Sequence, residues 1–206
     1  MHRAQRCVAR EFRQGHPWPR RQWLALLLTA LLAPACATTT AITGHDAAAL
    51  DRLVALILER LAVAPDVART KWNTKAPIED LTRERQIISA VGAGAGGYNL
   101  PRETAERVFQ GQIEASKIIQ TAMHEEFRSA HQMPFATVVD LDRKIRPVLD
   151  RLTPEMMRAL ADALPTLQRP GGRKALEARS RHLTIEAPGG RAAVRAAVAP
   201  LLDVSR

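Results

Sequence analysis

The segment from Lys71 to Val91 places charged side chains on the face where a helix should carry its core. Its second half has helical periodicity, and on a wheel of about 100° per residue Val91 falls close to Ile87. Three charged residues share that face, namely Asp80, Arg83 and Glu84. Charges at the rim of an apolar face are usually solvated or paired along the helix, so this pattern alone does not identify a site.

A second polar band lies on the helix expected from about Arg102 to His131. The apolar face of that helix consists of Ala105, Val108, Phe109, Ile119, Met123 and Phe127. Gln112, Ser116 and Gln120 interrupt this face at four-residue intervals, where they could satisfy one another or a backbone carbonyl. A buried polar group without a partner costs about 1–3 kcal/mol, and a domain stable by about 5–15 kcal/mol tolerates few such losses. Several helices that aim polar groups inward therefore need water, one another or a ligand to meet them.

Cations dominate the inward-facing set. Its members are Arg60, Lys71, Arg83, Arg146, Glu84, Ser116 and Gln120. On an unbroken helix, Arg60 and Lys71 would lie about 20° apart in azimuth and about 16 Å apart along the axis, close enough to bracket a ligand. Pro65 between them should interrupt the helix, and Arg60 taken alone also fits a surface side chain. The set as a whole predicts a small, compact ligand with several negative charges.

The elements that must position these residues are helices. The chain has 206 residues, few aromatic side chains and no alternating apolar pattern, which favours one all-α domain. We expect a bundle of long helices followed by shorter C-terminal helices. The first helix should be capped by Asp46, and Pro77 should open the helix that follows the connector. Residues 92–101 read as a loop, and the later helices are expected over residues 102–131, 146–164, 173–183 and 189–202.

Residues 1–37 have the pattern of a secretory signal peptide. They contain six arginines and one glutamate, and a basic region precedes the apolar run from Trp23 to Leu32. That run is shorter than the ~20 residues that span a bilayer. Small residues follow, and cleavage after Ala37 would release residues 38–206 as a single domain into the periplasm or outside the cell. Lipidation of Cys36 and an uncleaved N-terminal anchor are the alternatives.

Composition argues against several classes of function. The only cysteines are Cys7 and Cys36, so a product beginning at Thr38 has no disulfide and no thiol nucleophile. The histidines are scattered without metal-ligand spacing, and we expect no metal. More than half of the net charge of +9 lies in the expected signal peptide. We therefore expect no nucleic-acid partner, and no stable membrane insertion after signal removal.

Four sequence runs resemble the all-helical chorismate mutases. The runs are LERLAV, RTKW, PIEDLTRERQ and QIEASKIIQ, within residues 45–160, and the C-terminal RSRHL is similar to the secreted, periplasmic gamma subclass. The resemblance implies conversion of chorismate to prephenate by a Claisen rearrangement without a cofactor or covalent intermediate. It also implies a homodimer. Some secreted members have a C-terminal disulfide that this chain lacks, which leaves the packing of its C-terminal half open.

The resemblance implies a role for each charged residue of the set. Arg60 matches an arginine that holds a substrate carboxylate, and Lys71 matches a lysine that bonds the ether oxygen and a carboxylate. Arg83 matches the arginine of the second helix. Glu84 matches the neighbouring acid that receives the substrate hydroxyl, and Asp80 matches a position that lines the site.

The long helix and the helix after it complete the implied site. Ser116 and Gln120 match a serine/threonine and glutamine/glutamate pair, with Gln120 facing the ether oxygen. Arg146 is the best match for the remaining arginine, and Arg143 is the alternative. Fixed cations would hold the folded dianion, and the preset N–H groups of Lys71 and Gln120 would stabilise charge on the ether oxygen. The rival hypothesis is an exported, non-catalytic or chaperone-like module that binds a small anion in the same pocket.

Overall fold

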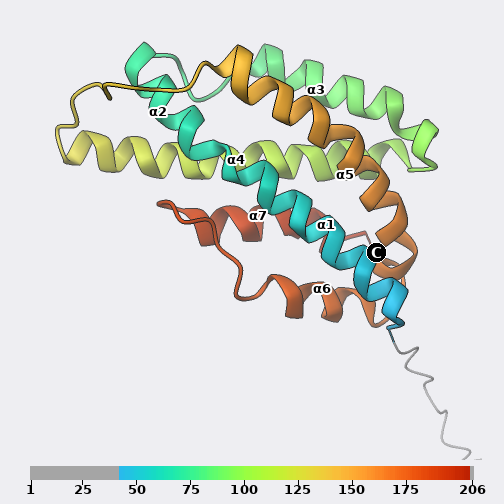
Figure 1. Cartoon of the computed structure of the whole chain (residues 1–206). Helices are drawn as coiled ribbons and strands as arrows, with labels where there is room; N and C mark the ends of the chain where they lie inside the picture. The colour runs from blue at the N-terminus through green and yellow to red at the C-terminus, as the bar shows by residue number, and fades with distance from the viewer. Residues whose placement is uncertain (1–41, 205–206) are drawn as a thin grey trace, which may run out of the picture. The chain divides into compact units, whose positions relative to one another are not determined.

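The structure, a computed structural model, describes residues 42–204, where helices joined by turns and loops are the secondary structure and no strand is present (Figure 1). The helices are α1 (Gly44–Ala62), α2 (Ala64–Thr74), α3 (Leu81–Gly94), α4 (Arg102–Ser129), α5 (Arg146–Leu167), α6 (Gly172–Ser180) and α7 (Gly190–Leu202). A 3-10 turn, η1 (Ala95–Tyr98), follows α3, and a π-helical turn, η2 (Leu141–Ile145), precedes α5. The predicted all-α bundle with shorter C-terminal helices is confirmed.

The predicted signal peptide lies outside the described residues, as do the expected cleavage site and Cys36. Within residues 42–204, no helix combines the length and apolar character needed to cross a bilayer.

The first helix begins with a reciprocal cap. The Thr43 hydroxyl accepts a hydrogen bond from the Asp46 backbone N–H, and the Asp46 carboxylate accepts one from the Thr43 N–H. The prediction that Asp46 is the N-cap is therefore wrong, because both residue types cap helices and only the backbone geometry separates them. Asp46 also accepts from the Thr166 hydroxyl and pairs with Arg169, which ties the start of α1 to the end of α5.

The predictions for two prolines near the predicted site have different outcomes. Pro65 interrupts the helix as expected, because α1 ends at Ala62 and Pro65 lies in the first turn of α2, where the missing N–H needs no partner. Pro77 does not open the next helix. That helix begins at Leu81, because the Asp80 carboxylate accepts from the Arg83 N–H at 2.9 Å and provides the cap.

The glycine-rich segment 92–101 is not the loop that we expected. Helix α3 continues to Gly94, and η1 extends the helical path to Tyr98. The chain turns at Asn99, which adopts a left-handed conformation with φ of 57°. Glycine tolerates helical dihedral angles at a cost of about 1 kcal/mol, which packing of the segment against α4 and α5 can offset.

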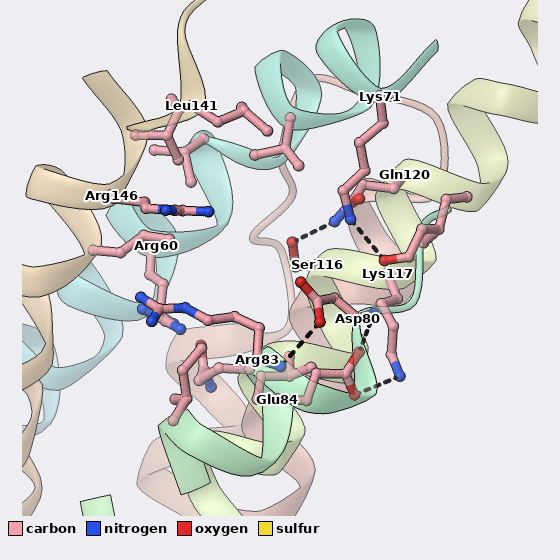
Figure 2. A pocket seen from close by; sticks show the side chains of 18 of the residues that line it. Arg60, Lys71, Asp80, Arg83, Glu84, Ser116, Lys117, Gln120, Leu141 and Arg146 are labelled. Carbon is pink, nitrogen blue, oxygen red and sulfur yellow. Dashed lines mark hydrogen bonds and ion pairs between the residues drawn. The ribbon is translucent and has the colours of Figure 1, made fainter. Parts of the chain in front are cut away.

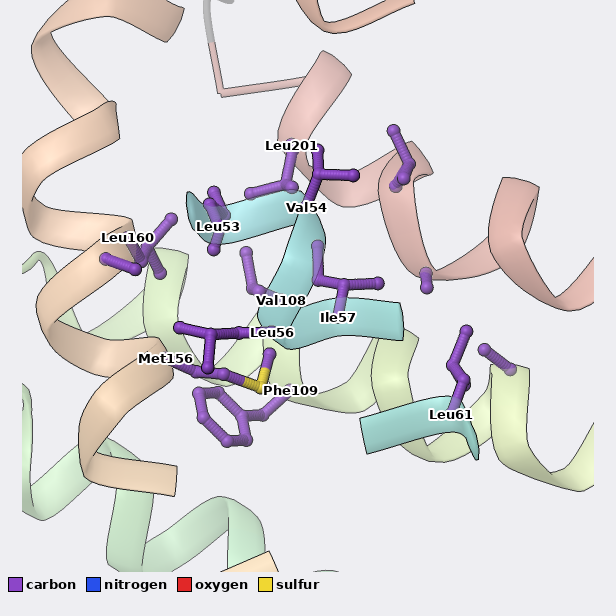
Figure 3. Close-up of a cluster of buried hydrophobic side chains, with 14 of the residues drawn as sticks. Leu53, Val54, Leu56, Ile57, Leu61, Val108, Phe109, Met156, Leu160 and Leu201 are labelled. Carbon is purple, nitrogen blue, oxygen red and sulfur yellow. The ribbon is translucent and has the colours of Figure 1, made fainter. Parts of the chain in front are cut away.

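The core lies between α1, α4, α5 and α7 (Figure 3). Leu53 and Ile57 of α1 and Phe109 of α4 are completely buried, and Leu160 of α5 is 1% exposed. Burying a side chain of this size stabilises a fold by about 1.5–3 kcal/mol. One face of α1 and one face of α4 therefore pack in the core, and the polar residues of both helices lie next to that core.

The connector from α4 to α5 is hydrogen-bonded to α2. Asn73 pairs with the backbone of Phe135 in both directions, at 2.8 Å each, and the Thr70 hydroxyl donates to the Val139 carbonyl at 2.9 Å. The Trp72 indole donates to the Gln132 carbonyl. These bonds bring the start of α5 beside the helix that carries Lys71.

The link between α1 and α5 predicts an acid-dependent contribution to stability. Hydrogen bonds from Arg169 and Thr43 hold the pKa of Asp46 well below its ordinary value of 3.8. These bonds therefore stabilise the fold fully above pH 3.8, and the stabilisation is lost as the pH falls through the lower folded-state pKa. We expect Asp46→Asn to lower the free energy of unfolding at neutral pH, with a deficit that shrinks steadily below pH 3.8.

Urea unfolding across that pH range measures the deficit. Asp162→Asn is the control, because Asp162 is exposed and forms no ion pair within residues 42–204. A deficit for Asp46→Asn that stayed the same size in acid would contradict the assignment.

Candidate functional site

A cavity of about 210 Å³ opens between α1, α2, α3, α4 and the start of α5 (Figure 2). All eight residues of the predicted site line it. They are Arg60, Lys71, Asp80, Arg83, Glu84, Ser116, Gln120 and Arg146. The alternative residue, Arg143, does not line the cavity and is exposed. The fold therefore brings together side chains that lie up to 86 positions apart in the sequence.

Arg60, in the last turn of α1, is a buried cation without an acidic partner. The residue is only 7% exposed, and it forms no ion pair with any acid of residues 42–204. Its Nη1 has no hydrogen-bond partner there, although the guanidinium lies 5.7 Å from the centre of the Phe109 ring. Burial lowers the pKa of Arg60 to about 10, so the group is still charged at neutral pH. The alternative of a solvated surface arginine is excluded.

Lys71, in the last turn of α2, is held by the connector that follows its own helix. Its Nζ donates to the Ile78 carbonyl at 2.7 Å, which leaves two of its three protons for other acceptors. Burial lowers the pKa of Lys71, and the nearby carboxylates of Asp80 and Glu84 act in the opposite direction. The ammonium group is thus fixed in direction and only partly satisfied.

The start of α3 explains part of the charged pattern in the sequence. Asp80 is the cap of the helix, and its backbone N–H donates to Glu84 Oε1 at 3.3 Å. The other oxygen of Glu84, Oε2, accepts from Lys117 Nζ at 3.2 Å. Arg83 lines the cavity without an acidic partner within the described part of the chain. These charges point to the cavity rather than to the apolar core.

Lys117 is a cavity residue that sequence reasoning missed. It falls outside the apolar face of α4, yet its Nζ lies 2.9 Å from Glu114 and 3.2 Å from Glu84. Burial acts to lower the pKa of Lys117, but hydrogen bonds to these two carboxylates outweigh it and raise the pKa. Its place between Ser116 and Gln120 in the sequence is the signal that could have identified it. Asp150 and Thr153 of α5 also line the cavity, and no sequence pattern singled them out.

Gln120 is buried with only part of its hydrogen bonding satisfied. Its Nε2 donates to Ser116 Oγ at 3.0 Å, as expected if the two residues satisfied each other. However, Gln120 Oε1 has no partner within residues 42–204, and Nε2 carries a second proton. The third member of the polar band, Gln112, also lines the cavity, and it donates to the Ala197 carbonyl of α7 at 3.0 Å.

Arg146 lies at the first position of α5, at the edge of the cavity. Its guanidinium pairs with Asp142 at 2.8 Å, and the side chain is half exposed. A cation at a helix N-terminus is disfavoured by the helix dipole, and Asp142 one turn earlier compensates for this. Arg146 can therefore exchange a solvated acid for an anion in the cavity without becoming buried and unpaired.

The lining as a whole is cationic with apolar walls. Five basic residues face three acidic ones, and Val63, Val67 and Ile87 are among the apolar residues. Lys117 and Arg146 already pair with acids, so Arg60, Lys71 and Arg83 are the cations that a ligand would satisfy. Within residues 42–204 no cluster of histidine, cysteine, aspartate or glutamate could hold a metal ion. The arrangement suits a small dianion with a carbon skeleton.

Known proteins are similar to this chain in sequence and in fold. Residues 47–121 match the family model for chorismate mutase type II. The secreted chorismate mutase of Mycolicibacterium smegmatis is 30% identical over 145 residues, which cover 70% of this chain and 80% of the relative. The secreted chorismate mutase of Mycobacterium tuberculosis is 29% identical over 140 residues, or 65% of this chain and 70% of the relative.

Solved structures that are similar to this chain are also chorismate mutases. The chorismate mutase from Burkholderia phymatum has a TM-score of 0.65 and 29% identity, over 77% of this chain and 98% of that one. The chorismate mutase from Burkholderia thailandensis has a TM-score of 0.64 and 31% identity, over 74% of this chain and 98% of that one.

The burial of Arg60 predicts that the ligand-free protein is less stable than a variant without this charge. Methionine keeps an apolar, unbranched side chain and has no charge, so Arg60→Met removes a desolvated cation together with its contact to the Phe109 ring. We expect the free energy of unfolding to rise by about 1–3 kcal/mol, because no buried acid is left unpaired by the change.

Urea denaturation without ligand measures this effect. Arg107→Met is the matched control, because Arg107 lies exposed on α4 and should change stability by less than about 0.5 kcal/mol. A loss of stability specific to Arg60→Met would mean that the guanidinium is well satisfied without a ligand.

Proposed function

The chain belongs to the family of type II, all-helical chorismate mutases, and from this membership we propose that it converts chorismate to prephenate in the cavity described above. The observation that carries the assignment to this cavity is the buried guanidinium of Arg60, which has a free N–H and no acid beside it among residues 42–204. A fold that keeps such a group charged must gain from binding an anion.

We propose that the cations hold the substrate in its folded form. Arg60 donates to one carboxylate of chorismate, and Arg146 exchanges Asp142 for the other. Figure 2 supports this, because Arg60 and Arg146 extend from one side of the opening while Lys71 and Gln120 lie on the other. Fixing both carboxylates brings the two reacting carbons together, and this converts a rare conformation of a flexible molecule into the bound one.

The chemical step moves electrons within the substrate alone. The ether C–O bond breaks as the new C–C bond forms, and negative charge grows on the ether oxygen. Lys71 Nζ and the second Nε2 proton of Gln120 donate to that oxygen, and both groups are already oriented by the Ile78 carbonyl and Ser116 Oγ. Preset donors of this kind stabilise a transition state without reorganisation.

The acids of α3 orient the ring of the substrate. Glu84 accepts the substrate hydroxyl, with its carboxylate held at one oxygen by the Asp80 N–H and at the other by Lys117. Asp80 also caps α3, so the position of Glu84 depends on the same residue that begins the helix. Arg83 adds positive charge at the entrance of the cavity.

We further propose that the enzyme acts outside the cytoplasm. The names of the relatives from Mycolicibacterium and Mycobacterium include the word secreted, and residues 1–37 have the pattern of a signal peptide. Cleavage after Ala37 would release residues 38–206 as one chorismate mutase domain in the periplasm or outside the cell. Family membership favours a homodimer, which sedimentation of the purified protein would test.

Loss of the ultraviolet absorbance of chorismate tests the proposed activity. We expect the purified protein to remove it without added metal or cofactor, and Lys71→Ala to lower kcat/KM about 10²–10³-fold because a donor to the ether oxygen is lost. Lys144→Ala is the control, since Lys144 is exposed and forms no ion pair within residues 42–204. Circular dichroism checks that each variant folds.

Two results would overturn these assignments. Binding of chorismate without any turnover would favour the non-catalytic module for a small anion. Undiminished turnover in a folded Lys71→Ala protein would remove Lys71 from the chemical step.

The neutral amide of Gln120 predicts an activity that varies little with pH between 5 and 8. A carboxyl group at this position donates only when protonated. We therefore expect Gln120→Glu to lose activity about tenfold for each pH unit above the pKa of the new carboxyl group, and to recover activity in acid.

Turnover measured at several pH values distinguishes this from simple damage to the site. Gln168→Glu, an exposed glutamine at the end of α5, is the control and should follow the unaltered protein. An equal loss for Gln120→Glu at both ends of the range would rule out the donor role.

A further inference from the structure

Positive charge in the exported part of the chain is concentrated at its C-terminal end. Residues 168–206 contain eight basic and three acidic residues, whereas residues 38–167 contain sixteen and seventeen. The described part of the C-terminal segment forms α6 and α7, which pack against each other (Figure 1). None of the residues 168–204 lines the catalytic cavity. The proposed reaction therefore leaves this charge unexplained.

Three arginines of this segment surround a second pocket. Arg181 follows the end of α6, and Arg191 and Arg195 lie one turn apart on α7 around a hollow of about 310 Å³. None of the three pairs with an acid within residues 42–204. The acid at the pocket wall, Glu177, is already paired with Arg173 at 3.0 Å. Like charges one turn apart destabilise a helix by about 0.2–0.5 kcal/mol, a cost that a bound anion would remove.

The backbone beneath these arginines is closely packed. A Cβ added to Gly190 would lie 1.9 Å from the Ile185 carbonyl oxygen, so only glycine fits where the connector between α6 and α7 folds back. Gly189 has φ of 75° and lies against Ile118 of α4. Leu183 packs against the hydrophobic core. The connector therefore fixes the end of α6, which precedes Arg181, relative to the start of α7, which carries Arg191 and Arg195.

We propose that this pocket is a second anion site, separate from the catalytic cavity, that binds a phosphate group of the phosphomonoester or pyrophosphate class. Guanidinium groups pair with phosphate oxygens in a bidentate manner. A compact group with two charges and several oxygens can contact all three arginines, whereas one carboxylate has only two oxygens to share. The Ser180 hydroxyl already donates its proton to the Leu176 carbonyl at 2.9 Å, so the guanidinium groups are the side-chain donors that remain for the phosphate. The phosphate can belong to a soluble molecule or to a lipid headgroup.

Thermal unfolding with inorganic pyrophosphate at constant ionic strength tests the site. We expect the midpoint to rise with the logarithm of the pyrophosphate concentration once that concentration exceeds Kd, as for a ligand that binds only the folded state. The double variant Arg191→Gln/Arg195→Gln should weaken this binding at least about tenfold. The matched control, Arg107→Gln/Arg128→Gln, removes the same charge from exposed positions on α4 and should change binding less than about twofold.

The catalytic cavity also attracts anions, so Arg60→Met is included and should keep the response. Turnover of chorismate should be unchanged in Arg191→Gln/Arg195→Gln, which separates failure of this site from failure of the proposed activity. An equal rise of the midpoint in both double variants would mean that pyrophosphate acts only by charge screening, and it would overturn the proposal. A response lost in Arg60→Met but kept in Arg191→Gln/Arg195→Gln would place the anion in the catalytic cavity, with the same consequence.

Vesicles identify the source of the phosphate. Co-sedimentation with phosphatidic acid vesicles, but not with phosphatidylcholine vesicles, that is lost only in Arg191→Gln/Arg195→Gln would assign the site to a lipid headgroup. A pyrophosphate response without such sedimentation would assign it to a soluble phosphate compound.

Discussion

The burial of one guanidinium, with no acid beside it in the described part of the chain, is the constraint on which the cavity depends. Arg60 follows directly after the most deeply buried part of α1, and its side chain reaches past Phe109 rather than out to solvent. Removing a cation from water is costly, and the usual remedies are a partner acid or loss of the charge. Within residues 42–204 neither is used, which fits the anion binding that we propose for Arg60: an acid would compete with the anion, and a neutral group could not pair with it. The apolar core between α1, α4 and α5 must supply the stability that this side chain gives up.

The other polar residues share one design. Each uses part of its hydrogen bonding to fix its own direction and keeps the rest for a ligand. Lys71 is fixed by the Ile78 carbonyl, Gln120 by Ser116, and Glu84 by the Asp80 N–H together with Lys117. Because the anchors are backbone groups or neighbouring side chains, the donors are already oriented before the substrate arrives. Such preorganisation lets a site accelerate a rearrangement in which no protein group takes part covalently.

The C-terminal helices support the helix that carries Ser116 and Gln120. Helix α7 packs along α4 with small buried side chains, among them Ala193 and Ala197, and Gly111 allows the close approach of Pro200. Gln112 bonds the Ala197 carbonyl across this contact. The described residues contain no cysteine, so packing, hydrogen bonds and ion pairs such as Arg179–Asp51 hold the C-terminal half. The same two helices also hold the arginine pocket, on a part of the fold that the catalytic cavity does not use.

Periodicity in the sequence determined the helices, and polar residues on apolar faces indicated a cationic cavity, because both depend on neighbours within a few turns of one helix. Resemblance to a family then implied a role for each of these residues, and all of them line the cavity. Tertiary structure alone decided that Arg60 is buried, that Lys117 anchors Glu84, and that Arg146 rather than Arg143 reaches the cavity. Cap choices such as Asp80 over Pro77 also needed the structure, since competing signals one turn apart differ by about 1 kcal/mol. The physical reason is that a helix wheel shows which face is apolar, but only packing decides which helix that face meets and in what register.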